Sequence, residues 1–235
     1  MKDPVKDLRI VWQGLFYSKY TSSSLTQINL VFWHADKSLY QRDVAIKMVG
    51  VLKVIGDNTE EKLERQMQWF DAFLYIFNKH WNKVDNFRID KFLMFLRFHI
   101  SAVMVMLKNN DYREDLVTWF TSMITRTIAD TTSSNEGNMG AGAQGVALQI
   151  TDVFVVELGK IDAKDISLET LAVLIKPFLT GMATSSSSIF RERLKDRIFT
   201  PLLESNVTMP DSEDEEEDDI PLYLLDQRKL QNKTR

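Results

Sequence analysis

Apolar residues recur at steps of three and four along most of this 235-residue chain, a pattern typical of amphipathic α-helices. The clearest stripe runs through residues 60–81, where Leu63, Met67, Phe70, Leu74 and Phe77 share one face. Alternating apolar and polar positions typical of strands are scarce. We therefore predict helices over residues 37–54, 60–81, 87–108, 112–129, 146–158, 167–183 and 189–203.

Local signals refine these helices. Residues 87–108 are apolar nearly all round, which predicts a buried central helix. Ser167 is an N-cap candidate for its helix, and Pro177 should kink or divide that helix. Residues 131–145 are rich in glycine and lack apolar periodicity, so we expect a flexible surface loop there.

The spacing of the helices predicts the architecture. They follow one another about every 20 residues as hairpin-like pairs, which favours an all-α fold of antiparallel helix pairs stacked as in HEAT or armadillo repeats. We expect this helical-repeat domain over residues 1–206. No clear internal sequence repeat is present, so an irregular helical bundle is the alternative.

Charge is distributed unevenly between the body and the end of the chain. The formal net charge is -4, but eight of the 33 acidic residues lie in residues 211–219. The rest of the chain carries 29 basic and 25 acidic residues and is mildly basic. We predict a disordered acidic tail over residues 207–235, with Ser212 as a candidate phosphosite and residues 220–225 as a short partner-binding motif.

No pattern typical of a catalytic or cofactor site is recognisable. The chain has no cysteine, and its three histidines are not at metal-binding spacing. The glycines of residues 137–145 are not followed by the Lys-Ser/Thr of a phosphate loop, and the longest apolar run, residues 100–107, falls well short of the ~20 residues of a membrane span. We expect no enzymatic activity, cofactor, metal, membrane or small-molecule substrate.

Two basic clusters are candidate contacts for RNA or a protein partner. They consist of Lys79, Lys83, Arg88 and Lys91, and of Arg191, Arg193, Lys195 and Arg197. A solvated helix face is the alternative interpretation of both. Around Arg88 and Lys91 an ion-pair network with Asp85 and Asp90 is also plausible, because the flanking Phe87, Ile89 and Phe92 resemble core residues.

Three segments together resemble the ribosomal RNA-processing protein 1 family, the Nop-fifty-two type of nucleolar factor. They are residues 12–17 (WQGLFY), residues 33–41 (WHADKSLYQ) and residues 81–92 (WNKVDNFRIDKF). Residues 146–158, with Asp152 and Glu157, and the Pro177-Phe178 pair are similar to later family segments. We expect Trp12, Trp81 and Phe92 to be core residues.

The chain departs from the family pattern in two places. Residues 19–31 separate two elements that are nearly contiguous in the family, so this segment is either a surface insertion or a gene-model artefact. Only about ten residues precede Trp12, where the family has a further helical pair.

The resemblance implies a non-enzymatic scaffold in the nucleolus, within the nucleus, that takes part in pre-ribosomal RNA processing. It implies that the chain sits in preribosomal particles of the large-subunit precursor and contacts assembly factors, ribosomal proteins and precursor RNA. The alternative is a helical-repeat adaptor in an unrelated complex.

Overall fold

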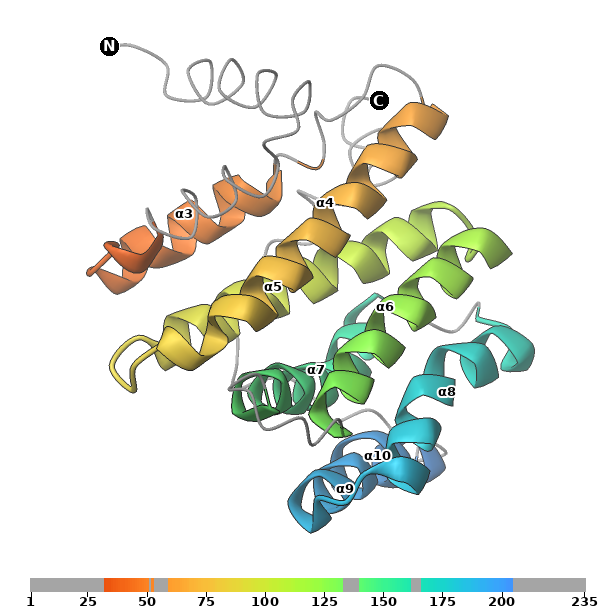
Figure 1. The fold of residues 1–235 in the computed structure, drawn as a ribbon. Helices are drawn as coiled ribbons and strands as arrows, with labels where there is room; N and C mark the ends of the chain where they lie inside the picture. The colour runs from red at the N-terminus through yellow and green to blue at the C-terminus, as the bar shows by residue number, and fades with distance from the viewer. Residues whose placement is uncertain (1–31, 51, 53–58, 133–139, 162–165, 205–235) are drawn as a thin grey trace.

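The computed structural model describes residues 32–50, 52, 59–132, 140–161 and 166–204, and all regular structure in these ranges is helical (Figure 1). The all-α fold class predicted from the sequence is confirmed. The elements are α3 (Ser38–Gly50), α4 (Thr59–His80), the short 3-10 helix η2 (Trp81–Lys83), α5 (Ile89–Asn109), α6 (Glu114–Thr132), α7 (Gly140–Lys160), α8 (Leu168–Thr184), α9 (Ser188–Leu194), the π-helical turn η4 (Lys195–Phe199) and α10 (Thr200–Glu204).

The helices form a stack in which the closest backbone contacts join helices next but one in sequence, such as α3 with α5, α5 with α7 and α6 with α8. Helices α4 and α5 run side by side in opposite directions, and α6 reverses again (Figure 1). Helix α5 packs against α3 and α7, α6 packs against α7 and α8, and α8 packs against α9. This arrangement is that of a helical repeat, in which each pair buries its apolar face against the next pair.

Helix α5 forms the centre of the core. Its side chains are buried almost without interruption from Ile100 to Leu107, as its all-round apolar sequence predicts. Phe92 and Phe95 pack against the Phe32 ring with ring centroids 5.3 and 4.6 Å away. Phe92 and Trp81 are both buried, which confirms two of the three predicted core aromatics.

The prediction of a flexible loop over residues 131–145 is wrong at both of its ends. Helix α6 continues through Thr132, and α7 already begins at Gly140. A Cβ atom on Gly145 would lie 2.2 Å from Nε1 of Trp81, so this glycine lets α7 approach the Trp81 indole closely. Glycine in a helix costs about 1 kcal/mol relative to alanine, and this close packing offsets the cost.

Helix α8 is a single helix and is not divided at Pro177, contrary to one of the two predicted outcomes. Proline removes the N–H that would bond the carbonyl of Val173, but Val173 lies on the exposed side, where water can replace that bond. Ser167 caps the helix, as predicted: its Oγ accepts a hydrogen bond from the Thr170 N–H at 3.1 Å.

Several predictions fall on segments outside the described residues. These are the core position of Trp12, the insertion of residues 19–31, the acidic tail with Ser212, and the apolar motif of residues 220–225. None of the helices within the described ranges is long and apolar enough to cross a membrane.

Candidate partner-binding surfaces

Lys91 is a structural residue and not an exposed contact, so its prediction as an RNA or partner contact is wrong. Its side chain is buried, and its Nζ donates hydrogen bonds to the carbonyls of Trp33 at 2.7 Å and Ala35 at 2.8 Å. Burial lowers the pKa of Lys91, and the neighbouring Arg88 lowers it further. The ammonium therefore joins the 33–35 segment to the start of α5 and is not available to an external phosphate.

Arg88 and Asp85 hold the turn between η2 and α5 in one shape. The two side chains form an ion pair, and the Phe87 N–H donates to Oδ1 of Asp85 at 3.1 Å. The Arg88 guanidinium also lies 4.9 Å from the centroid of the Trp33 ring, within the range of a cation–π interaction. Of the ion-pair network proposed from the sequence, the structure shows the Asp85–Arg88 pair, whereas Lys91 bonds backbone carbonyls instead.

Phe87 projects from this turn into solvent. The sequence predicted a core residue here, but the side chain is 99% exposed. The prediction failed because Phe87 belongs to the turn and not to the helix, so the helical apolar period does not apply to it. A large aromatic ring held in a fixed turn beside an arginine is typical of interaction surfaces.

Lys79 and Lys83 are exposed at the end of α4 and in η2, close to that turn. The Lys79 Nζ lies 5.8 Å from the ring centroid of the exposed Tyr75. The pKa of His80 is lowered, first by burial and then by the positive charges of Lys83 and Lys79. We call Tyr75, Lys79, Lys83, Phe87 and Arg88 the α4–α5 surface, which combines cations with exposed aromatic rings.

The second basic cluster lies on α9 and η4. Arg193 and Arg197 both approach Oδ1 of Asp152 on α7, at 3.3 and 3.7 Å. Burial raises the pKa of the Asp152 carboxyl, and the two arginines act in the opposite direction. One carboxylate thus faces two guanidiniums.

The other two members of this cluster differ in exposure. Lys195 is exposed, whereas Arg191 is half-buried and donates to the carbonyl of Ser185 at 2.5 Å. Five residues line a surface hollow of about 400 Å³ beside them: Ile189, Glu192, Arg193, Asp196 and Arg197. We call this region the α9–η4 surface; its cations are accompanied by the acidic Glu192 and Asp196.

The π-helical turn in this surface follows from Pro201. Proline has no N–H to bond the carbonyl of Arg197, and its ring would clash with that carbonyl in a regular α-helix. The helix instead takes one extra residue into this turn, and the Thr200 N–H donates a hydrogen bond to the carbonyl of Lys195, five residues earlier. Such π-turns occur frequently at functional sites, and this one lies among the cations of the α9–η4 surface.

A buried ion pair was not anticipated from the sequence. Nε of Arg97 on α5 lies 2.7 Å from Oε1 of Glu157 on α7, and Nζ of Lys160 lies 3.6 Å from the same oxygen. Glu157 is only 3% exposed. The available signal was the position of Arg97 and Glu157 among the apolar residues of their helices, because such charges are buried only when paired. The pair joins α5 to α7.

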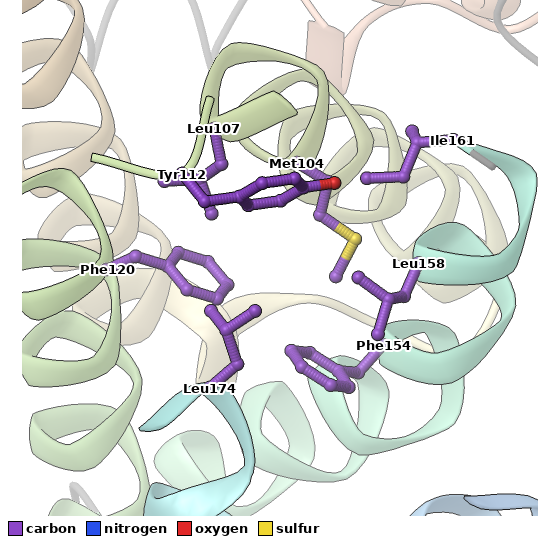
Figure 2. Close-up of a pocket in the computed structure, with 8 residues that line it drawn as sticks. All are labelled: Met104, Leu107, Tyr112, Phe120, Phe154, Leu158, Ile161 and Leu174. Atoms are coloured by element: carbon purple, nitrogen blue, oxygen red, sulfur yellow. The ribbon is translucent and has the colours of Figure 1, made fainter. Parts of the chain in front are cut away.

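The described residues offer little room for a small molecule in the interior. Figure 2 shows an apolar gap between α5, α6, α7 and α8, lined by side chains that include Met104, Phe120, Phe154 and Leu174. This gap is too tight to admit a water molecule. Within the described ranges, no group of three or more histidine, aspartate or glutamate side chains is arranged to hold a metal ion.

Comparison with known proteins identifies relatives. A family model described as "Nucleolar protein, Nop52" matches residues 4–223. The chain is 25% identical over 197 residues to the Drosophila melanogaster protein called ribosomal RNA processing protein 1 homolog, which covers 84% of this chain and 25% of that protein. It is 22% identical over 211 residues to ribosomal RNA processing protein 1 homolog B of Mus musculus, covering 90% of this chain and 26% of that protein.

The protein called ribosomal RNA processing protein 1 homolog in Dictyostelium discoideum is 23% identical over 212 residues, with 82% of this chain and 38% of that protein covered. The chain therefore spans between about a quarter and two fifths of the length of these relatives.

Proposed function

We propose, on the premise that the chain belongs to the Nop52 family of nucleolar proteins, that it is a non-enzymatic helical scaffold in ribosome biogenesis. It acts in the nucleolus, within preribosomal particles of the large-subunit precursor, and supports the processing of pre-ribosomal RNA. The observation that carries this proposal is the family match, which extends over the whole helical-repeat body and beyond it. Relatives named for ribosomal RNA processing support it.

A helical repeat suits this role because it presents a long surface to several partners at once. The α4–α5 surface and the α9–η4 surface lie on different helix pairs, so two partners can bind together. We assign preribosome assembly factors, ribosomal proteins and precursor RNA as those partners. Processing would depend on the scaffold indirectly, through the placement of RNA and factors relative to the nucleases.

The two surfaces differ in the contacts that they can make. Lys79 and Lys83 can neutralise phosphates, and Tyr75 and Phe87 can stack on unpaired bases, as in proteins that bind single-stranded nucleic acid. Arg193, Lys195 and Arg197 can also bind phosphates, but Asp152, Glu192 and Asp196 reduce the local excess of positive charge. We therefore assign direct RNA contact to the α4–α5 surface first.

The test is affinity purification of the tagged full chain from its own cells, with sequencing of ultraviolet-crosslinked RNA. We expect ribosomal RNA precursors together with large-subunit assembly factors. Lys79→Glu/Lys83→Glu should reduce the crosslinked RNA strongly, whereas the control Lys37→Glu, at an exposed lysine in the bend before α3, should not.

Recovery of assembly factors without crosslinked RNA would keep the place in biogenesis but make the chain a protein–protein adaptor. Recovery of neither RNA precursors nor assembly factors would overturn the proposed function.

A further inference from the structure

Helix α8 carries a second apolar face that the described elements cover only in part: Leu171, Ile175 and Met182 pack partly against the core, while Leu168, Ala172 and Leu179 are exposed. One of its faces packs on α6, with Leu174 and Phe178 buried. A neighbouring face, which we call the α8 stripe, is half-buried to exposed and consists of Leu168, Leu171, Ala172, Ile175, Leu179 and Met182. These residues recur at steps of three and four and so form one continuous band. A continuous exposed apolar patch marks an interaction site, unlike apolar residues scattered singly over a surface, so this band predicts an occupant.

The stripe leads directly to the α9–η4 surface. Helix α9 packs against α8. Its second residue, Ile189, is 66% exposed and lines the same hollow as Arg193 and Arg197. An apolar band on α8 is therefore followed, across a short connection, by a group of exposed cations. Figure 1 shows α8 at the margin of the stack, with α9 and α10 beside its C-terminal end.

The chain that follows α10 has the complementary chemistry in the matching order. Helix α10 ends at Glu204, next to η4, and the eight acidic residues of 211–219 come first. Residues 220–225 (IPLYLL), which are all apolar or aromatic, come next. The folded surface shows the same order: moving away from α10, the cations of η4 and α9 come first, and the α8 stripe comes next.

The connection is long enough. Residues 205–210 and Asp211 can extend up to ~24 Å at ~3.4 Å per residue, while Arg197 lies only two helical turns before Glu204. The 16 residues from Glu204 to Ile220 can extend up to ~55 Å. Helix α8 has 17 residues and is therefore only ~26 Å long, so the apolar segment can reach any part of the stripe.

The family match adds an independent observation. It runs past the end of α10, across the acidic run, and ends at residue 223, inside the apolar segment. The segment therefore lies within the region that the family model describes and is not an appendage outside it.

We propose that residues 211–225 bind back onto their own chain, with the acidic run on Arg193, Lys195 and Arg197 and with residues 220–225 on the α8 stripe. The acidic run then occupies the cations of the α9–η4 surface as an internal polyanion, and an external polyanion must displace it. This inference does not rest on the proposed function, because it concerns only contacts within the chain.

The absence of cysteine from the sequence makes a clean test possible. In the full chain, Leu179→Cys is combined with Tyr223→Cys and treated with a short bismaleimide. The matched control pairs Tyr223→Cys with Leu39→Cys, an 82% exposed position on α3. We expect intramolecular cross-linking of the 179–223 pair to be on the order of tenfold faster than that of the control, because docking raises the effective concentration of the two thiols.

Replacing Leu222, Leu224 and Leu225 by serine should reduce the rate to the control level. Leu168→Cys provides a second cross-linking position on the stripe, in case the change at Leu179 impairs folding. Leu168 is 80% exposed. Equal rates for the stripe and control pairs would overturn the proposal. Cross-links that form mainly between two chains would also overturn it, since a second copy would then occupy the stripe.

Discussion

His99 should make the protein less stable in mild acid. Its ring is buried in the aromatic core and stacks on Phe73 with centroids 3.6 Å apart. Nδ1 lies 2.9 Å from the carbonyl oxygen of Phe95, which can only accept, so Nδ1 carries the proton of the neutral ring. Nε2 is buried without a hydrogen-bond partner among the described residues. Burial lowers the pKa of His99 from 6.5 to about 3.

The sign and the size of the effect follow from proton linkage. Below pH 6.5 the unfolded chain binds a proton at His99 that the folded chain does not bind until the pH approaches about 3. Stability is therefore fully present above pH 6.5 and is lost as the pH falls between those two values. Between pH 7 and pH 5 the expected loss in the free energy of unfolding is about 2 kcal/mol, at ~1.4 kcal/mol per pKa unit.

The measurement is urea unfolding of the full chain at pH 7 and pH 5. His99→Phe keeps an aromatic ring in the stack and removes the titration, so its stability difference between the two pH values should be smaller than that of the parent by about 2 kcal/mol. His34→Gln, at an exposed position, is the control for replacing a histidine outside the core. All three proteins carry the same carboxyl groups, Asp152 included. An equal pH difference in His99→Phe and the parent would refute the assignment of acid sensitivity to His99.

Three further substitutions test the packing by urea unfolding at pH 7. Phe92→Ala should cost about 3–5 kcal/mol because the ring is buried; a loss below about 1 kcal/mol would contradict its core position. Glu157→Ala removes the 2.7 Å ion pair that Glu157 forms with Arg97 and should cost about 3–5 kcal/mol, and adding Arg97→Leu should recover part of that loss. Gly145→Ala places a Cβ atom against the Trp81 indole and should cost about 1–3 kcal/mol; unchanged stability would show that α7 moves away without penalty.

Hydrophobic periodicity predicts most of this fold because each helix buries one side. The burial of α5 could be predicted because its apolar residues surround the whole helix. The helical start of α7 could not be predicted, since its glycines disfavour a helix locally and only the distant Trp81 makes the small size of Gly145 useful. Tertiary contact overrides local preference there.

The candidate surfaces were harder to predict because the sequence does not distinguish an exposed basic residue from a buried one. Lys79 is exposed, and Lys91, which lies in the same cluster of the sequence, is buried against two backbone carbonyls. Phe87 shows the converse, an apolar residue that is almost fully exposed. Only the three-dimensional positions of the turn and of the 33–35 carbonyls separate these cases.

The packing of α3 has a consequence for how the chain folds during synthesis. Among the described helices, α3 makes its main contacts with α5 and not with α4, which follows it in sequence. The carbonyls of Trp33 and Ala35 likewise receive their hydrogen bonds from Lys91, at the start of α5. On a translating ribosome, α3 therefore emerges before its partner helix exists, and α4 must emerge as well before docking can begin. The apolar side of α3 stays exposed during that interval, which at ~5–20 residues per second lasts for seconds, long enough for a chaperone to bind it.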